Sequence, residues 1–238
     1  MADPVSFGPI ARSGVSDAVY RQLRDAILTG AIGAGEALPG ERALAEQFGV
    51  ARHGLREAIR RLQQARLVEV SHGGATRVLD WRVSAGLEVL SELASASLVA
   101  GGAILRSALE MRLAIGVDAA RLAAVRASAT AAAEIEAFVA GSAGVADPVE
   151  QAERYERFWR LIIVAGDNLA YQLAYNSLVV AMNANVEVTG PLSAPEAADL
   201  RSQRSLAAAI ASGDAEAAAS AARGLTSVML GGLSATVD

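Results

Sequence analysis

Apolar side chains recur at helical spacing in three segments near the start of the chain. Residues 15–29 and 52–64 carry them at positions i, i+3, i+4 and i+7, and a shorter segment between Gly40 and Gly49 repeats the pattern. Such stripes are typical of helices that bury one face and expose the other. The pattern therefore predicts three helices, the second with Gly40 as its N-cap and Gly49 at its end.

After the third predicted helix the pattern changes to alternation. The segment LVEVSHGGATRVLDW, residues 67–81, places apolar and polar side chains in turn on either side of HGG. A period of two indicates strands, and adjacent glycines favour a tight turn between them. We therefore expect a first domain over residues 10–80, built from three helices and a hairpin.

Beyond a short joint at residues 80–84, the pattern is helical to the end of the chain. Short glycine-containing segments divide it, among them TGP at 189, and no strand pattern competes. The sequence thus predicts a mainly α protein whose second domain, residues 84–236, is an all-helical bundle of about six or seven helices. The predicted helices are 84–98, 103–127, 129–140, 148–165, 168–188, 194–211 and 214–233.

Composition narrows the class of protein. The 238 residues are 53% hydrophobic and include no cysteine, which excludes disulfides, thiol nucleophiles and cysteine metal sites. The first residues lack the basic and apolar regions of a signal peptide, and no apolar run is long enough to span a bilayer. We expect a soluble, cytoplasmic protein without membrane contact.

The net charge of −5 hides a difference between the two predicted domains. Residues 1–82 hold 11 arginines against 9 acidic residues, whereas residues 83–238 hold 10 against 17. The stretch 51–82 is more basic still, with 7 arginines against 3 acids. This excess of positive charge favours a polyanionic partner for the first domain.

The predicted third helix has a basic face. Arg52, Arg56 and Arg60 recur every four residues, with His53 beside them, and residues at this spacing share one side of a helix. A solvated charged face is the plain interpretation. The short helix, tight turn, second amphipathic helix and hairpin instead match a winged helix-turn-helix, in which such a face enters the major groove and arginines contact phosphates.

A longer motif supports this interpretation. GAIGAGEALPGERALAEQFGVARHGLREAIRRLQQARLVEV, with its LP-x-ER-x-LA, GV-x-R and REA-x-x-x-L elements, resembles the winged helix-turn-helix of the GntR superfamily of bacterial transcriptional regulators. The helical half is similar to the effector domain of the FadR subgroup, so the likeness covers residues 14–235. It implies a homodimeric regulator, in most such proteins a repressor, on a near-palindromic double-stranded DNA operator.

The resemblance also assigns DNA contacts, to arginines of the second and third helices and to a His-Gly wing tip in the minor groove. His53 replaces a small hydroxyl residue of the family. Ala51 replaces a Ser or Thr that caps the helix, and Gly54 replaces a base-facing Thr or Pro, so we expect a different operator preference. The implied DNA contacts are Arg42, Arg52, His53, Arg56, His72 and Gly73.

Metal and catalytic roles for the two histidines find no support in the sequence. His53 and His72 have no third histidine or cysteine to complete a usual zinc site. No arrangement of nucleophile, base and oxyanion donor stands out either. We therefore expect a protein that is not an enzyme and has no cofactor.

Many regulators with this kind of helical domain bind a metal through an Asp and three His. The matching positions are Tyr155, Trp159, Gln203 and Leu225, and no histidine follows residue 72. These side chains predict either simple core packing or an apolar effector pocket with a few hydrogen-bonding groups. Such a pocket suits a fatty acid or acyl-CoA, as in the lipid-responsive members of the subgroup.

Arg112 lies between apolar rows of a long helix, where a charge needs a partner. That partner is Glu110, an acid on another helix, or an anionic group of an effector. Arg106 matches the arginine of the family's R-x-x-LE pattern, and Asn176 and Asn183 share a helix face. The expected effector contacts are Arg106, Arg112, Tyr155, Trp159, Asn176 and Gln203.

Two alternatives to a lipid-responsive repressor stay open. One is a sensor of a small organic acid that Arg106 or Arg112 holds. The other is an architectural DNA-binding dimer without any effector, for which no ligand would change the affinity for DNA.

Overall fold

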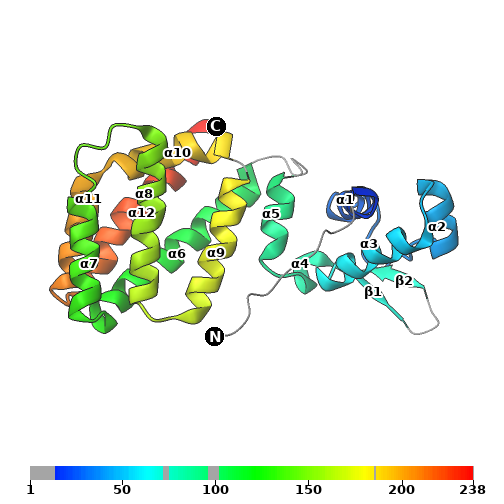
Figure 1. The fold of residues 1–238 in the computed structure, drawn as a ribbon, viewed down its shortest axis with the longest axis horizontal. Helices are drawn as coiled ribbons and strands as arrows, with labels where there is room; N and C mark the ends of the chain where they lie inside the picture. Colours follow the sequence, from blue (N-terminus) through cyan, green and yellow to red (C-terminus); the bar gives the residue numbers. More distant parts are fainter. Residues whose placement is uncertain (1–13, 72–74, 96–101, 185, 238) are drawn as a thin grey trace, which may run out of the picture. The chain divides into compact units, whose positions relative to one another are not determined.

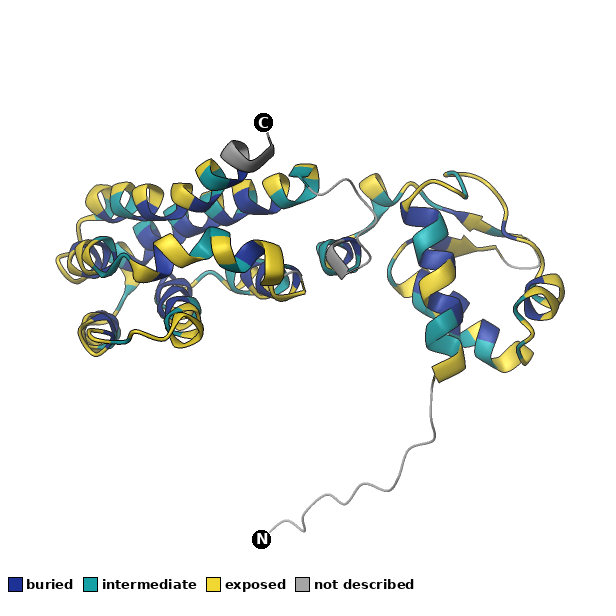
Figure 2. Ribbon diagram, turned by 90° about the horizontal axis from the view of Figure 1, so that it is seen from above, coloured by how far each residue is buried: buried dark blue, intermediate teal, exposed yellow. Residues whose placement is uncertain are grey.

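The computed structural model divides into two compact units, Met1–Gly86 and Leu87–Asp238. Each unit is mainly helical (Figure 1), and the predicted fold class is confirmed. Buried residues lie on the inward faces of the helices in each unit (Figure 2). The residues that the structure describes are 14–71, 75–95, 102–184 and 186–237.

Unit 1 has the helices and the hairpin that the sequence predicts. Its elements are α1 (Gly14–Leu28), α2 (Glu41–Phe48), α3 (Arg52–Gln64), β1 (Val68–Val70), β2 (Thr76–Val78) and α4 (Trp81–Ser84). The strands β1 and β2 are antiparallel, with Val68 opposite Val78 and Val70 opposite Thr76. The predicted turn between them, residues 72–74, lies outside the described residues.

A third extended segment pairs with β2, which the hydrophobic pattern does not indicate. The Gly35 N–H donates to the Val78 carbonyl and the Leu38 N–H to the Thr76 carbonyl, each at 2.8 Å. Between these bonds, Ala37 forms a bridge with Arg77. The connection from α1 to α2 is thereby tied to the hairpin.

The core of unit 1 forms around α3. Leu55, Ala58 and Leu62 are fully buried on its inner face, and α3 packs against α1, α2 and β1. Gly49 ends α2 with a φ of +64°, a left-handed conformation that glycine adopts without strain. This turn lets α2 and α3 pack together while the outer face of α3 stays in solvent.

Unit 2 is a helical bundle. Its elements are α5 (Glu88–Ser95), α6 (Gly102–Arg126), α7 (Ala129–Ala140), α8 (Pro148–Ala165), α9 (Leu169–Asn183), α10 (Val186–Ala198), α11 (Leu200–Ala211) and α12 (Ala215–Val237). Helix α6 is central and packs against α12, α8, α11, α9 and α5. The helix expected to start at residue 84 begins at Glu88. None of the described helices combines the length and the apolar character needed to cross a lipid bilayer.

Further predicted helix boundaries in unit 2 are wrong. The helix expected over 168–188 ends at Asn183. The break expected at TGP lies inside α10, which contains Pro191 and Pro195, and the helix expected over 194–211 is interrupted at Asp199. Proline disfavours a helix interior because it has no N–H to donate. Tertiary packing outweighs this preference here, since α10 packs against α12, α8 and α9 and Glu196 is fully buried.

Side-chain caps begin several helices of unit 2. The Asp199 carboxylate accepts hydrogen bonds from Ser202 N at 3.0 Å and Ser202 Oγ at 2.6 Å. These bonds satisfy an N–H group at the start of α11. The hydrogen bonds from Ser202 also hold the pKa of Asp199 below its ordinary value of 3.8.

We expect Asp199→Ala to lower the free energy of unfolding by about 1 kcal/mol, because the cap is lost. A carboxylate whose pKa is lowered by folding stabilises the native state at pH values above its pKa in the unfolded chain. This contribution is lost as the pH falls through its pKa in the folded protein. Chemical denaturation at pH 7 and at pH 3 measures both effects. Asp199→Asn is the matched control, since asparagine caps as well without titrating; an equal loss in both variants contradicts the prediction.

Candidate functional site

The outer face of α3 is basic and exposed. Arg52, His53, Arg56 and Arg60 are all exposed, and the opposite face is buried in the core of unit 1. The N-cap residue Ala51 makes no side-chain hydrogen bond to the helix, as expected from the sequence. The first N–H groups of α3 thus have no side-chain cap, and such groups favour anions.

Acidic neighbours hold two of these arginines. Arg56 Nε donates to Glu41 Oε2 at 2.7 Å, and Arg60 Nη2 donates to Glu57 Oε1 at 2.9 Å. The Arg56 and Arg60 side chains remain 66% and 63% exposed, so solvent screens both pairs and each is weak. The Nη groups of Arg56 make no hydrogen bond within the described chain, which leaves them to contact a phosphate or a base.

The other predicted DNA contacts lie outside α3. Arg42 is exposed in the first turn of α2, with its Nε 3.9 Å from Glu46 Oε1. His72 and Gly73 lie outside the described residues. Gly54 is half-buried in α3, and a Cβ at this position would come no closer than 4.0 Å to Val15, so a side chain fits there.

In unit 2, a buried ion pair joins α6 to α10. Arg112 Nη2 donates to Glu196 Oε2 at 2.6 Å, and the Tyr155 hydroxyl donates to the same oxygen at 2.9 Å. Arg112 is 6% exposed and Glu196 is 0% exposed. Arg112 Nη2 also lies 3.2 Å from the Tyr155 hydroxyl. The acid that the sequence requires beside Arg112 is therefore Glu196 on another helix, and Glu110 is exposed.

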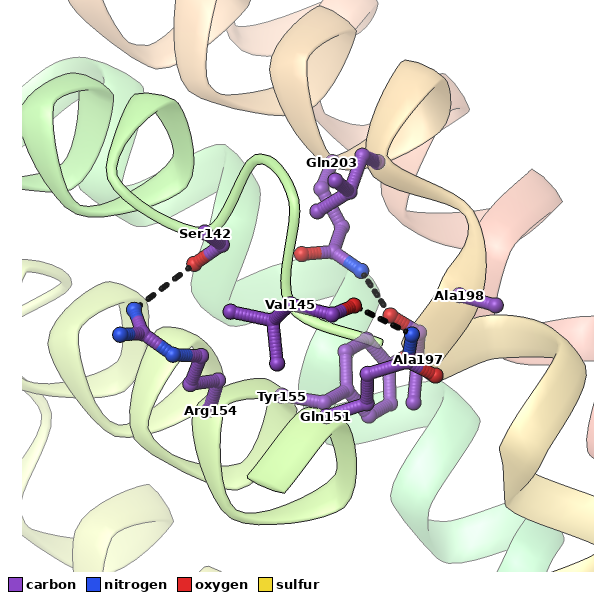
Figure 3. A pocket seen from close by; sticks show the side chains of 9 residues that line it. Ser142, Val145, Gln151, Arg154, Tyr155, Ala197, Ala198 and Gln203 are labelled. Atoms are coloured by element: carbon purple, nitrogen blue, oxygen red, sulfur yellow. Dashed lines mark hydrogen bonds between the residues drawn. The ribbon is translucent and has the colours of Figure 1, made fainter. Parts of the chain in front are cut away.

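Further hydrogen bonds complete this cluster. The Met229 N–H in α12 donates to Glu196 Oε1 at 2.8 Å. Gln203 Nε2 donates to the main-chain carbonyls of Glu196 at 3.1 Å and Ala197 at 3.0 Å, the second of which is drawn in Figure 3. Glu196 thus links α10 to α6, α8 and α12 through its carboxylate, and α11 holds its main chain.

Burial controls the ionisation of this region. It raises the pKa of Tyr155 and of Tyr175 well above the ordinary range, so both remain neutral phenols. Burial by itself lowers the pKa of Arg112, but the Glu196 carboxylate opposes burial and the pKa is raised. The cluster therefore holds one positive and one negative charge, with the tyrosine as an uncharged hydrogen-bonding group.

A cavity of about 110 Å³ lies against the ion pair. It is bounded by side chains from α6, α8, α9 and α10, and its wall includes Arg112, Tyr155, Trp159 and Tyr175. A smaller hollow of about 30 Å³, shown in Figure 3, also has Tyr155 in its wall and is lined by Gln151, Arg154 and Gln203 among others. The larger cavity combines aromatic walls with a few polar groups, as sites for small molecules do.

The structure brings some of the predicted effector contacts together and separates others. Arg112, Tyr155 and Trp159 line the larger cavity, and Gln203 is buried beneath Glu196. Arg106 is exposed and is not part of the cavity wall. Asn176 is also exposed and accepts a hydrogen bond from Arg160 at 3.0 Å, whereas Asn183, on the same helix, lines the cavity.

The positions that bind metal in many related domains do not fit a metal here. Tyr155, Trp159, Gln203 and Leu225 are all buried, and none offers the carboxylate or imidazole that such sites use. The described residues contain no group of three His, Asp or Glu that could hold an ion. The charged group in this region is instead the Arg112–Glu196 pair.

Comparison with known families agrees with this arrangement. Residues 15–78 match "Bacterial regulatory proteins, gntR family" and residues 107–227 match the FCD domain. The HTH-type transcriptional regulator Mce2R of Mycobacterium tuberculosis (strain CDC 1551 / Oshkosh) is 34% identical over 217 residues, which are 91% of this chain and 90% of that protein. The chain belongs to the GntR family. It is a DNA-binding transcriptional regulator with an FCD domain.

Two further relatives of this GntR regulator are informative. The HTH-type transcriptional repressor NanR of Klebsiella aerogenes is 36% identical over 96 residues, 40% of this chain and 37% of that protein. The solved structure of Lar, described as controlling expression of the Listeria monocytogenes agr system, has a TM-score of 0.56 at 15% identity and covers 97% of this chain and 99% of that one. Lar thus shares the fold.

Two groups of this GntR regulator that hold the cluster together, Glu196 and the Met229 N–H, were not predicted from the sequence. Glu196 lies in the first turn of the helix predicted over 194–211, where an acidic residue is common and usually exposed. The Met229 N–H is a main-chain group in the middle of a helix and gives no signal in the sequence. The only signal in the sequence was Arg112, whose position between apolar rows of its helix requires an acidic partner but does not indicate which one.

Proposed function

We propose that this GntR regulator is a homodimeric repressor of the FadR subgroup whose α3 helices read a near-palindromic operator. The observation that carries the proposal is the exposed row Arg52, Arg56 and Arg60 on α3, with the Nη groups of Arg56 uncommitted. Arg42 adds a phosphate contact from α2, and His72 and Gly73 supply the wing contact. The name of the NanR relative supports repression rather than activation.

The proposed effector binds in the cavity between α6, α8, α9 and α10. The sequence predicts either a fatty acid or acyl-CoA, or a small organic acid held by Arg106 or Arg112. By size, the cavity suits a ligand as small as an organic acid better than a fatty acid or acyl-CoA. The cavity of about 110 Å³ is well below the roughly 300–1,000 Å³ of drug-sized ligand sites. The effector acts by binding one arrangement of the FCD domain better than another, which shifts the population of dimers whose two α3 helices match the operator.

Selection of DNA from random duplexes by the purified protein tests the DNA-binding part. We expect enrichment of one sequence with two inverted half-sites, because two copies of α3 related by a two-fold axis contact equivalent bases. Footprinting of the selected sequence then gives the half-site spacing. Recovery of sequences with only one half-site, or of random sequences, contradicts a dimer that reads a specific operator.

The effector-free alternative is tested on the same selected duplex. A small-molecule extract of the native cells is added while fluorescence anisotropy reports the affinity for the duplex. A regulator with an effector changes its affinity at least severalfold, whereas an architectural DNA-binding dimer keeps a constant affinity.

A further inference from the structure

The cavity against the ion pair has no unbalanced positive charge. Arg112 in its wall is already neutralised by Glu196 at 2.6 Å. The other charged residue of the wall is Glu156, which pairs with Arg160 at 2.8 Å. An anion that enters the cavity therefore meets two arginine–carboxylate pairs, in which each positive charge is already balanced.

The cavity does offer a hydrogen-bond donor. Arg112 Nη1 is buried and has no hydrogen-bond acceptor in the described chain, whereas Trp159 Nε1, also buried, interacts with the Tyr155 hydroxyl. Both residues line the cavity, and both are more than nine-tenths buried, at 6% and 2% exposed. A buried donor such as Arg112 Nη1 requires an acceptor from outside the protein, either a water or an oxygen atom of a ligand.

The remaining wall is mostly apolar. Leu178, Val179 and Met182 contribute aliphatic surface, and Tyr155 and Tyr175 contribute ring faces from neutral phenols. Thr189, which also lines the cavity, donates its hydroxyl to the Met182 carbonyl at 2.9 Å. The site thus combines an unfilled donor on Arg112, apolar walls and a balanced charge.

We infer that the effector of this regulator is a small uncharged molecule with an acceptor oxygen, such as an amide or a ketone, rather than a carboxylate. Its oxygen accepts from Arg112 Nη1, and its apolar body packs against Leu178, Val179 and Met182. This inference rests on the proposed effector role of the cavity and names the chemical class of the ligand.

Charge is the reason that a carboxylate fits less well. Placing one beside Arg112 in a buried site adds a negative charge next to Glu196, and like charges in a poorly solvated environment repel strongly. Moving Glu196 away would break its bonds to Tyr155 and to the Met229 N–H as well as to Arg112. A neutral carbonyl oxygen avoids both penalties and still satisfies the free donor.

The size of the cavity limits the ligand further. A protein cavity of about 150 Å³ accommodates benzene, so about 110 Å³ suits a molecule of about six non-hydrogen atoms or slightly fewer. Isobutyramide and isobutyrate have the same number of non-hydrogen atoms and nearly the same shape. They differ in charge, which makes them a matched pair of probes.

Two-dimensional ¹H–¹⁵N spectra of the full chain provide the readout, because the protein has two tryptophans. Trp159 lines the cavity, and Trp81 lies on α4 in unit 1. A spectrum of Trp159→Phe assigns the two indole signals. We expect isobutyramide to shift the Trp159 indole signal saturably and to leave the Trp81 signal in place, and isobutyrate at equal concentration to shift neither.

The variant Arg112→Lys tests the role of Nη1. Lysine keeps a positive charge for Glu196 but lacks the second guanidinium nitrogen, so isobutyramide should bind about tenfold more weakly, as expected for one lost hydrogen bond to a charged donor. Dispersed spectra confirm that the variant is folded. Exposed Arg157→Lys on the same bundle is the matched control and should bind the amide as the unaltered protein does.

Three results overturn the inference. In the first, isobutyrate shifts the Trp159 signal at a lower concentration than isobutyramide does. The ligand is then an anion, although the cavity still serves as an effector site. Equal amide binding by Arg112→Lys removes Nη1 as the recognition group. The third result is that neither probe shifts the Trp159 signal. Anisotropy with the selected duplex, measured on the same sample, separates these results from a failure of the proposed DNA-binding function, in which the duplex itself is not bound.

Discussion

Operator affinity is expected to fall about a hundredfold when Arg52 and Arg56 are both replaced by alanine, because each arginine contact to a base edge contributes about 1–3 kcal/mol. Both side chains are exposed on the outer face of α3. Glu41 accepts a hydrogen bond from Arg56 Nε at 2.7 Å, and the Nη groups of Arg56 make no hydrogen bond within the described chain. Folding should be unaffected, since neither residue contributes to the core.

Salt dependence separates base contacts from phosphate contacts. Each lost phosphate contact reduces the slope of log K against log salt by about 0.9, so titrations at several salt concentrations show how many were removed. The variant Arg201→Ala/Arg204→Ala is the matched control, since it removes the same charge from exposed positions on α11. If the control loses as much affinity as the α3 variant, net charge explains the binding and α3 does not read the operator.

The parts of the fold that follow from local pattern were predictable. The stripe with Leu55, Ala58 and Leu62 defines both the buried face of α3 and, by exclusion, its basic face. The pairing of Gly35 and Leu38 with β2 was not predictable, because it depends on a contact between distant segments that leaves no periodic trace. Local sequence specifies which residues must be buried, and tertiary packing decides which partners they meet.

The cavity lined by Arg112, Tyr155 and Trp159 shows the same limit more sharply. The aromatic pair Tyr155 and Trp159 could be placed in unit 2 from helical spacing, and the structure brings both to the cavity wall. Arg106 and Arg112 were both expected to contact an effector, yet one is exposed and the other is buried beside Glu196. The difference depends on the rotation of α6 in the bundle, and the charged and apolar residues of this helix are spread too evenly around it to define that rotation.

Under the proposed function, this arrangement gives the FCD domain a means of transmitting ligand binding to α10. Glu196 receives hydrogen bonds from side chains on α6 and α8 and from the main chain of α12. A ligand bound at Arg112 Nη1 therefore contacts the residue that holds α10 in place. Because packed interiors favour discrete arrangements over continuous deformation, a small change at this pair can select between two packings of α10.

The stability of unit 2 should depend strongly on this pair. We expect Glu196→Ala to lower the free energy of unfolding by about 3–5 kcal/mol, because it leaves the buried Arg112 charge uncompensated. It also removes the acceptor of the Met229 N–H and of the Tyr155 hydroxyl. Urea denaturation followed by circular dichroism measures the change, with the transition of unit 2 fitted separately from that of unit 1 because two-domain proteins need not unfold in one step.

Removing the charges of both Arg112 and Glu196 should restore much of the stability that Glu196→Ala loses. In Arg112→Met/Glu196→Gln, the glutamine amide oxygen replaces the acceptor of the Met229 N–H, and the methionine fills the space of the arginine stem without a charge. Glu153→Ala is the exposed control on α8 and should change stability by no more than about 0.5 kcal/mol. If Glu196→Ala is as mild as Glu153→Ala, or if the double variant is less stable than Glu196→Ala, then compensation of the Arg112 charge is not what holds α10 against α6.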